Sequence, residues 1–155
     1  MYTAVLALHS WLRWGALIAG VLAVASLASS KSSDARSVDG DRWSLFFMIA
    51  LDLQLLIGLL LYLFISPNTT AMFRDFGAAM RDPVARFWAV EHVTLMFVAI
   101  VAAHVGRVLG RKAASPAAGR SKMLVAFIIA LVAIMAATPW PGMRAGRPLF
   151  RISAP

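Results

Sequence analysis

Residues 43–65 read WSLFFMIALDLQLLIGLLLYLFI, and Asp52 is the only charged residue in this run. A helix needs ~20 predominantly apolar residues to cross the hydrocarbon core of a bilayer. Three further runs approach that length, and they lie at 3–28, 87–109 and 123–138. Runs of this length without alternating apolar and polar residues do not fit strands, so the sequence predicts an all-α fold. Little of the chain lies outside the runs. We expect an integral membrane, antiparallel four-helix bundle that forms a single transmembrane domain over 1–155.

The composition is typical of a membrane protein. Of the 155 residues, 61% are hydrophobic, and the mean hydropathy is +0.77, whereas soluble domains contain roughly 45–50% apolar residues. In a soluble protein the net charge of +8 would suggest nucleic acid as a partner. Here no nucleic acid is expected, and the charge indicates contact with anionic lipid headgroups. The chain has no cysteine, which excludes disulfides, iron–sulfur clusters and covalently attached c-type haem.

The basic residues favour one orientation in the membrane. The polar loop 29–42 and the loop after the third run lie on the same side of a four-span weave. The second of these loops has no acidic residue and contains the basic residues Arg107, Arg111, Lys112, Arg120 and Lys122. Positive residues favour the cytoplasmic face, so we expect both termini outside.

A short segment between the second and third runs has a helical pattern of its own. Pro67 stops the second helix. Apolar residues then recur at helical spacing, namely Met72, Phe73, Phe76, Ala79 and Met80. We predict a short amphipathic helix that lies in the membrane interface; the alternative is an ordinary loop that covers the bundle.

Histidines occur at matching depths in the first and third runs, because His9 and His92 each lie about six residues into their run. In an up-and-down weave these two runs are parallel and diagonal, so both imidazoles are expected at one level near the outer surface. Each histidine shares a helical face with small residues deeper in its run. Small residues let helices approach closely, so both rings are expected to point inward. Two neutral imidazoles in this arrangement can ligate one haem iron.

Charged residues near these histidines are expected to be paired. Arg13 lies about 6 Å deeper than His9 at 1.5 Å per residue, and its side chain tilts back toward the level of Glu91. We predict an Arg13–Glu91 ion pair, because a lone arginine at this depth would cost several kcal/mol. The alternative is that Arg13 or Arg86 binds a haem propionate.

Asp52 and His104 form a second predicted pair. The second run goes in the opposite direction to the third, so Asp52 falls toward the depth of His104. We predict a hydrogen bond between the two side chains. It would be either half of a proton path or one satisfied buried pair in the bundle.

Four motifs resemble those of one group of proteins. The motifs are HSWLRW at 9–14, QLLIGLLLY at 54–62, RFWAVEH at 86–92 and PWP at 139–141. The chain resembles the small four-span bacterial membrane proteins that often carry the label cytochrome b. The resemblance covers nearly the whole chain, and it implies a bacterial inner membrane location and a b-type haem held by His9 and His92. Members of the group often have histidine where this chain has Asp52, so the resemblance implies no second haem ligand at that position.

Two functions from different classes remain open. The first is a membrane-embedded b-type haem protein that passes electrons between quinone or a respiratory complex and an outer-face acceptor. Its candidate cofactor-binding residues are His9, His92, Arg13 and Arg86. The second is a cofactor-free accessory or assembly subunit of a larger membrane complex, or a homo-oligomer, in which the polar residues are purely structural. Those polar residues include Glu91, Asp52 and His104.

A metal site on His9 and His92, with Glu91 as a carboxylate ligand, is a third possibility that suits zinc or iron. No catalytic residue emerges from the sequence. An electron-transfer or accessory subunit is therefore favoured over a stand-alone enzyme, and a transporter is disfavoured because no internal repeat is present.

Overall fold

The computed structural model describes residues 1–29 and 38–150, with the side chains described from residue 42 in the second segment. The predicted polar loop 29–42 therefore lies largely outside the described residues. Within those residues the structure is helical and has no strand, which confirms the all-α prediction. The elements in order are α1 (Tyr2–Ser29), α2 (Val38–Leu60), η1 (Leu61–Ile65), α3 (Pro67–Arg74), α4 (Phe76–Arg81), α5 (Pro83–Arg86), η2 (Phe87–Glu91), α6 (His92–Arg111) and α7 (Pro116–Ala137).

The described part of the chain contains four helices that are long and apolar enough to cross a membrane. They are Tyr2–Ser29, Arg42–Ile65, Pro83–Arg111 and Pro116–Ala137. The first three match the predicted runs to within a few residues, but the fourth begins at Pro116 rather than at residue 123. Ser115 explains this difference, because its hydroxyl accepts a hydrogen bond from the backbone N–H of Ala118 at 3.3 Å and so caps the helix. The helix thus begins in the polar segment that precedes the apolar run.

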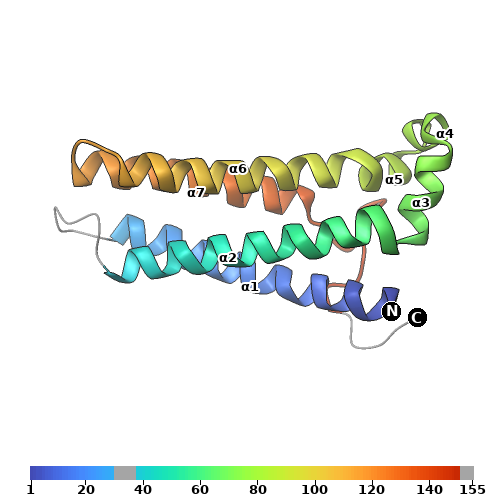
Figure 1. Ribbon diagram of the computed structural model, residues 1–155, viewed down its shortest axis with the longest axis horizontal. Helices are drawn as coiled ribbons and strands as arrows, with labels where there is room; N and C mark the ends of the chain where they lie inside the picture. Colours follow the sequence, from blue (N-terminus) through green and yellow to red (C-terminus); the bar gives the residue numbers. More distant parts are fainter. Residues whose placement is uncertain (30–37, 151–155) are drawn as a thin grey trace.

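The long helices lie side by side along the long axis of the molecule (Figure 1). α1 packs against α2 and α7, and α6 packs against α7 and α2. α1 and α6 are therefore diagonal to each other, as the sequence predicted. The two helices that carry His9 and His92 face each other across the interior of the bundle.

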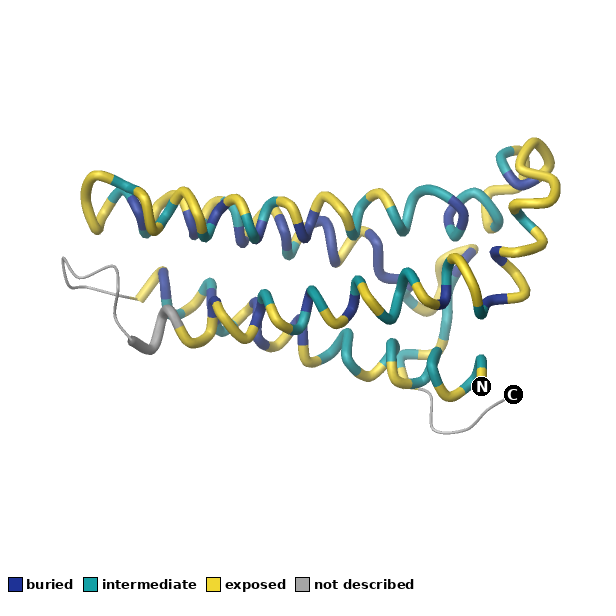
Figure 2. Tube along the Cα trace, viewed as in Figure 1, coloured by how far each residue is buried: buried dark blue, intermediate teal, exposed yellow. Residues whose placement is uncertain are grey.

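Buried and exposed positions alternate along the long helices (Figure 2), and about half of the buried apolar residues are alanines, whereas many large apolar side chains are exposed. Fully buried positions are occupied by Ala23 on α1, Ala103 on α6 and Ala130 on α7. Two aromatic rings fill the middle, since Phe47 and Phe127 meet edge to face with their centroids 5.4 Å apart. Small interior residues and large apolar outer residues are the pattern by which helices associate in lipid.

The predicted single helix between the second and third spans is wrong in one respect, because Asp75 divides it. The Asp75 carboxylate accepts a hydrogen bond from the backbone N–H of Ala78 at 2.8 Å, so Asp75 ends α3 and caps α4. Aspartate favours this position because its side chain satisfies an N–H that the helix leaves free. On the predicted apolar face, Ala79 is buried and Phe73 packs edge to face against Tyr62 at 5.0 Å. α3 and α4 thus link the end of η1 to α5, at the same end of the molecule as the beginning of α1 (Figure 1).

Candidate functional site

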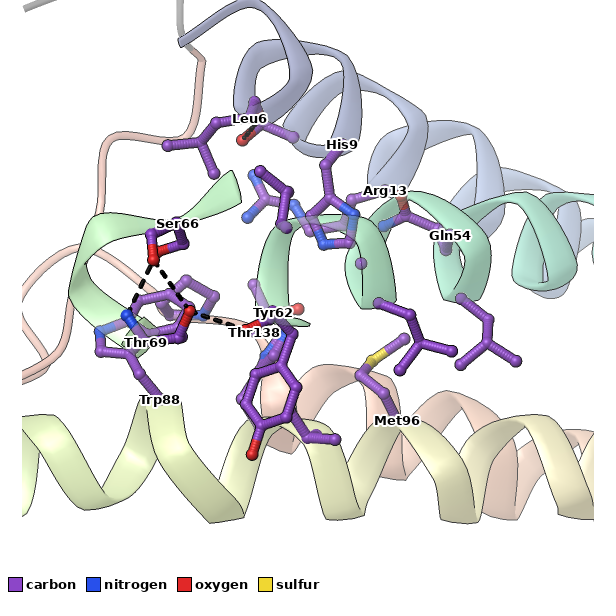
Figure 3. Close-up of a pocket in the computed structure, with 18 of the residues that line it drawn as sticks. Leu6, His9, Arg13, Gln54, Tyr62, Ser66, Thr69, Trp88, Met96 and Thr138 are labelled. Atoms are coloured by element: carbon purple, nitrogen blue, oxygen red, sulfur yellow. Dashed lines mark hydrogen bonds between the residues drawn. The ribbon is translucent and has the colours of Figure 1, made fainter. Parts of the chain in front are cut away.

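A cavity opens between the long helices at the end of the bundle where α1 begins and α7 ends. On α1 its lining extends from Tyr2 to Ala16, which is about 21 Å along the helix at 1.5 Å per residue. α2 with η1, η2 with α6, and the end of α7 supply the other walls. Figure 3 shows His9 and Arg13 reaching into this space from α1 and Met96 from α6. The cavity is thus a long, mostly apolar cleft with a few polar groups, as is usual for cofactor sites.

His9 and His92 face each other across this cleft. Their ring centroids are 6.4 Å apart, with an interplanar angle of 68°. A metal–imidazole bond is about 2.0–2.1 Å long and the ring centre lies roughly 1.1 Å beyond the bonded nitrogen, so two axial imidazoles have centres about 6.3 Å apart. The planes of two axial imidazoles both contain the ligand axis, so they can take any angle to each other. The spacing of the two rings is therefore compatible with two imidazoles on one metal ion, and it is also that of an ordinary edge contact between two rings.

The backbone around the two histidines fixes the tautomer of His92 and leaves room for the ring of His9. The carbonyl of Ala137 lies 2.8 Å from His92 Nδ1. A carbonyl can only accept, so Nδ1–H donates and the lone pair of the neutral ring lies on Nε2. Metal-ligating histidines are commonly oriented by such a bond. His9 lies over Gly58, where an added Cβ would be 3.2 Å from His9 Cε1. Glycine at this position of α2 gives the imidazole room.

Three polar atoms of the cavity lining are buried and have no hydrogen-bond partner among the described residues. They are His9 Nδ1, Arg13 Nε and Gln54 Oε1. Unpaired buried polar atoms are rare in folded proteins, because each loses its hydration without compensation. Their concentration on one cavity indicates that a polar ligand or ordered water belongs there.

Two π-helical turns flank the cavity, one in each of two neighbouring walls. η1 contains Tyr62, whose hydroxyl donates a hydrogen bond to the carbonyl of Ala89 in η2. η2 contains Trp88, whose ring lies against His92 with the centroids 5.5 Å apart. Single π turns within longer helices are frequent at functional sites. Here they join two walls of the cavity and bring an indole against one of the two histidines.

The segment after α7 turns back over α1 and closes one side of the cavity. Arg13 Nη2 and Trp14 Nε1 both donate to the carbonyl of Leu149, at 3.0 and 3.2 Å. Phe150 stacks on Trp14 with the centroids 5.4 Å apart, and the guanidinium of Arg147 lies 5.0 Å from the centre of the Trp88 ring. Arg147 and Arg13 are thereby both held at the wall of the cavity.

The predicted Arg13–Glu91 ion pair is wrong. Glu91 Oε1 instead accepts from Arg86 Nε at 2.7 Å, and both side chains are 43% exposed. The reason is local, because a π turn places residues i and i+5 above one another. Arg13 Nη2 instead donates to the Leu149 carbonyl, whereas Arg13 Nε has no partner among the described residues. Arg86, a candidate for a haem propionate, is engaged by Glu91 and is not among the cavity-lining residues.

We expect Glu91→Gln to change stability only slightly, by about 1 kcal/mol or less. The Arg86–Glu91 pair is almost half exposed, and pairs of this kind contribute little because water competes for the charges. Thermal unfolding of the purified protein in detergent would measure the change. The double variant Arg86→Gln/Glu91→Gln should match the single one. A loss above about 3 kcal/mol would instead indicate a buried charge left without its partner.

The predicted Asp52–His104 hydrogen bond is present, with His104 Nε2 2.8 Å from Asp52 Oδ1. Neither residue lines the cavity. The pair therefore does not belong to the site of His9 and His92. Among the residues that the structure describes, no three histidine, cysteine or acidic side chains are grouped as metal ligands. Glu91 in particular turns to Arg86, so it does not complete a three-ligand set with the histidines.

Comparison with known proteins finds no matching protein family, no matching curated protein and no matching solved structure. The likeness to the group labelled cytochrome b therefore remains an expectation based on four short motifs. The site also contains residues to which the sequence analysis assigned no role, namely Gln54, Tyr62, Trp88 and Arg147. The sequence contained a signal for Gln54, because an amide side chain in the middle of a long apolar run costs free energy and often marks a functional position.

Proposed function

We propose that this protein is a membrane-embedded b-type haem protein in which His9 and His92 bind one iron from opposite sides. The observation that carries the proposal is the 6.4 Å spacing of the two rings across a common cleft. The protein would be an antiparallel four-helix bundle in the bacterial inner membrane with both termini outside. This orientation rests on the distribution of basic residues between the loops.

The layout of the cleft supports a flat ligand between the rings. The histidines face each other across the bundle from diagonal helices, whereas the lining of the cleft extends along the helices. His9 and His92 would hold the iron of such a ligand, and the apolar lining of the cleft would hold its flat ring system. Arg13 and Arg147 lie at the wall of the cleft and would hold carboxylate substituents.

The chemistry supplied by a bound haem is one-electron transfer, and its potential depends on axial ligands, hydrogen bonds and burial. This chain contributes the Ala137 carbonyl, which orients His92 and makes its ring a stronger donor. It also contributes a mostly apolar lining around the rings. A membrane-embedded site near the outer face would pass electrons between quinone or a respiratory complex and an outer-face acceptor.

A cofactor-free accessory subunit is the second candidate, and the size of the cavity favours it. The cavity has a volume of about 150 Å³, and a cavity of about that size holds a benzene ring. A haem macrocycle is larger than this space, so the lining would have to open to admit it. The unpaired atoms of His9, Arg13 and Gln54 favour a ligand over an empty structural core.

Absorption spectroscopy distinguishes the two functions. The protein should be expressed with ample haem, purified in detergent, and measured oxidised and after reduction with dithionite. We expect a Soret band and, on reduction, the sharp bands of a low-spin, six-coordinate iron. A protein of normal stability that shows no Soret band would contradict the haem proposal and leave the accessory subunit.

A further inference from the structure

One wall of the cavity is formed by a segment that is not a long helix. Residues 138–150, here called the strap, follow α7 and cross to the side of α1 (Figure 1). The strap contributes Thr138, Pro139, Arg147 and Pro148 to the lining. The other walls are α1, α2 with η1, η2 with α6, and α7, together with the beginning of α3. The strap is therefore the wall that can change without the displacement of a long helix.

The strap has backbone hydrogen bonds of its own. The backbone N–H of Arg147 donates to the carbonyl of Pro139 at 3.0 Å, and that of Gly146 donates to the carbonyl of Met143 at 2.9 Å. A Cβ at residue 146 would lie 2.6 Å from the carbonyl oxygen of Trp140, so this close turn requires glycine. These hydrogen bonds lie within the strap, so they would remain if the strap left the helices.

Side chains hold the strap against the helices at two points. On α1, Trp14 Nε1 donates to the Leu149 carbonyl at 3.2 Å, and Phe150 stacks on the Trp14 ring. On η2, the Trp88 ring lies 5.0 Å from the guanidinium of Arg147. A single hydrogen bond or cation–π contact contributes little net free energy, whereas α1 packs extensively against α2, and α6 against α7. Release of the strap therefore costs less free energy than separation of the packed helices.

The groups that hold the strap also line the cavity. Arg13 Nη2 donates to the Leu149 carbonyl at 3.0 Å, while its Nε is one of the unpaired buried atoms of the lining. Arg147 and Trp88 both line the cavity, and the Trp88 ring lies against His92. A ligand that engages the two arginines would therefore compete with the contacts that keep the strap closed.

We propose that the strap is the gate of the cavity. Its release from Trp14 and Trp88 opens the cavity at the end of the bundle where α1 begins, and so admits a ligand larger than the present space. The inference rests on the proposed function only in that the cavity receives a ligand. Opening can be measured in protein without haem, so the gate and the haem proposal can fail separately.

Thiol accessibility measures the opening, because the chain has no cysteine of its own. Met96→Cys places one thiol in the cavity, since Met96 reaches into it from α6 (Figure 3). The rate of its modification by a charged, water-soluble methanethiosulfonate would be measured in lipid nanodiscs, which leave both membrane faces accessible. In this background Trp14→Phe removes the hydrogen bond to Leu149 and keeps a ring for Phe150. We expect modification to become about two- to tenfold faster, as the loss of one net hydrogen bond predicts.

Trp43→Phe is the matched control, because it makes the same substitution near the beginning of α2 at a residue that does not line the cavity. It should leave the rate unchanged. Arg147→Gln removes the contact with Trp88 and should accelerate modification from the second holding point, which keeps the test open if Trp14→Phe does not fold. A melting curve of each variant identifies those that fold. Equal acceleration by Trp43→Phe, or no acceleration by a folded strap variant, would overturn the gate.

A lipid-soluble maleimide distinguishes the gate from a lateral route between α2 and α6. Through the gate, the charged reagent reaches the thiol of Met96→Cys and the strap variants accelerate it. Through the lateral route, only the lipid-soluble reagent reacts, at a rate that the strap variants leave unchanged. The second result would show that ligands enter from the bilayer and that the strap is a fixed wall.

Discussion

In the haem protein that we propose, His92→Ala is expected to abolish the low-spin haem spectrum, and His9→Ala is expected to do the same. A six-coordinate, low-spin iron needs two strong axial donors, and each substitution removes one of them. The two rings lie 6.4 Å apart and would each supply one ligand. Either variant therefore keeps only one of the two proposed iron ligands. Spectra of the oxidised and reduced variants, normalised to protein, would measure either loss of haem or conversion to a five-coordinate form.

The control for this prediction is His104→Ala. His104 bonds to Asp52 at 2.8 Å and does not line the cavity, so its loss should leave the spectrum unchanged. A spectrum that survives His92→Ala but disappears in His104→Ala would place the haem elsewhere. A melting curve of each variant separates loss of a ligand from loss of the fold.

Gly106→Ala is expected to destabilise the bundle by about 3 kcal/mol. An added Cβ at Gly106 would meet the Cβ of Ala126 on α7 well inside van der Waals contact. The atom in the way is fixed to the backbone, so α6 and α7 must move apart. Overpacking of this kind typically costs about 1–3 kcal/mol, and occasionally more. Denaturation in mixed micelles with increasing dodecyl sulfate would measure the free energy of unfolding.

Two further variants make the test specific. At Gly15 an added Cβ meets nothing within 4 Å, so Gly15→Ala should be neutral or stabilise the helix slightly, by up to about 1 kcal/mol. The double variant Gly106→Ala/Ala126→Gly moves the methyl group to the opposite helix and should recover much of the lost stability. An equal loss in Gly15→Ala, or no recovery in the double variant, would contradict the packing argument.

Several features were predictable from the sequence because they depend on one helix at a time. The long helices follow from runs of apolar residues, and the inward faces of His9 and His92 follow from the 3.6-residue period and the small residues on the same side. The Asp52–His104 bond follows from the predicted weave, in which consecutive apolar runs go in opposite directions and bring these two positions level. The boundary of the fourth span was missed because capping at Ser115 extends a helix beyond its apolar residues.

Other features were decided by the tertiary structure. The partner of Arg13 is a backbone carbonyl of Leu149, and any residue could supply that group, so no sequence signal announces it. The partner of Glu91 is Arg86 because η2 is a π turn, and an ordinary helix would not place these residues above one another. Gln54 belongs to the site only because the cavity opens beside it.

The sequence by itself thus determined the number of long helices and the faces that they bury, because apolar length and helical period are properties of short segments. The tertiary structure decided which polar atoms meet across the cavity. Those contacts depend on where the segment after α7 returns and on a one-residue change of register in two helices. A hydrogen bond requires a donor–acceptor distance of about 3 Å. Shifts of one helix against another by less than a turn therefore determine which hydrogen bonds can form.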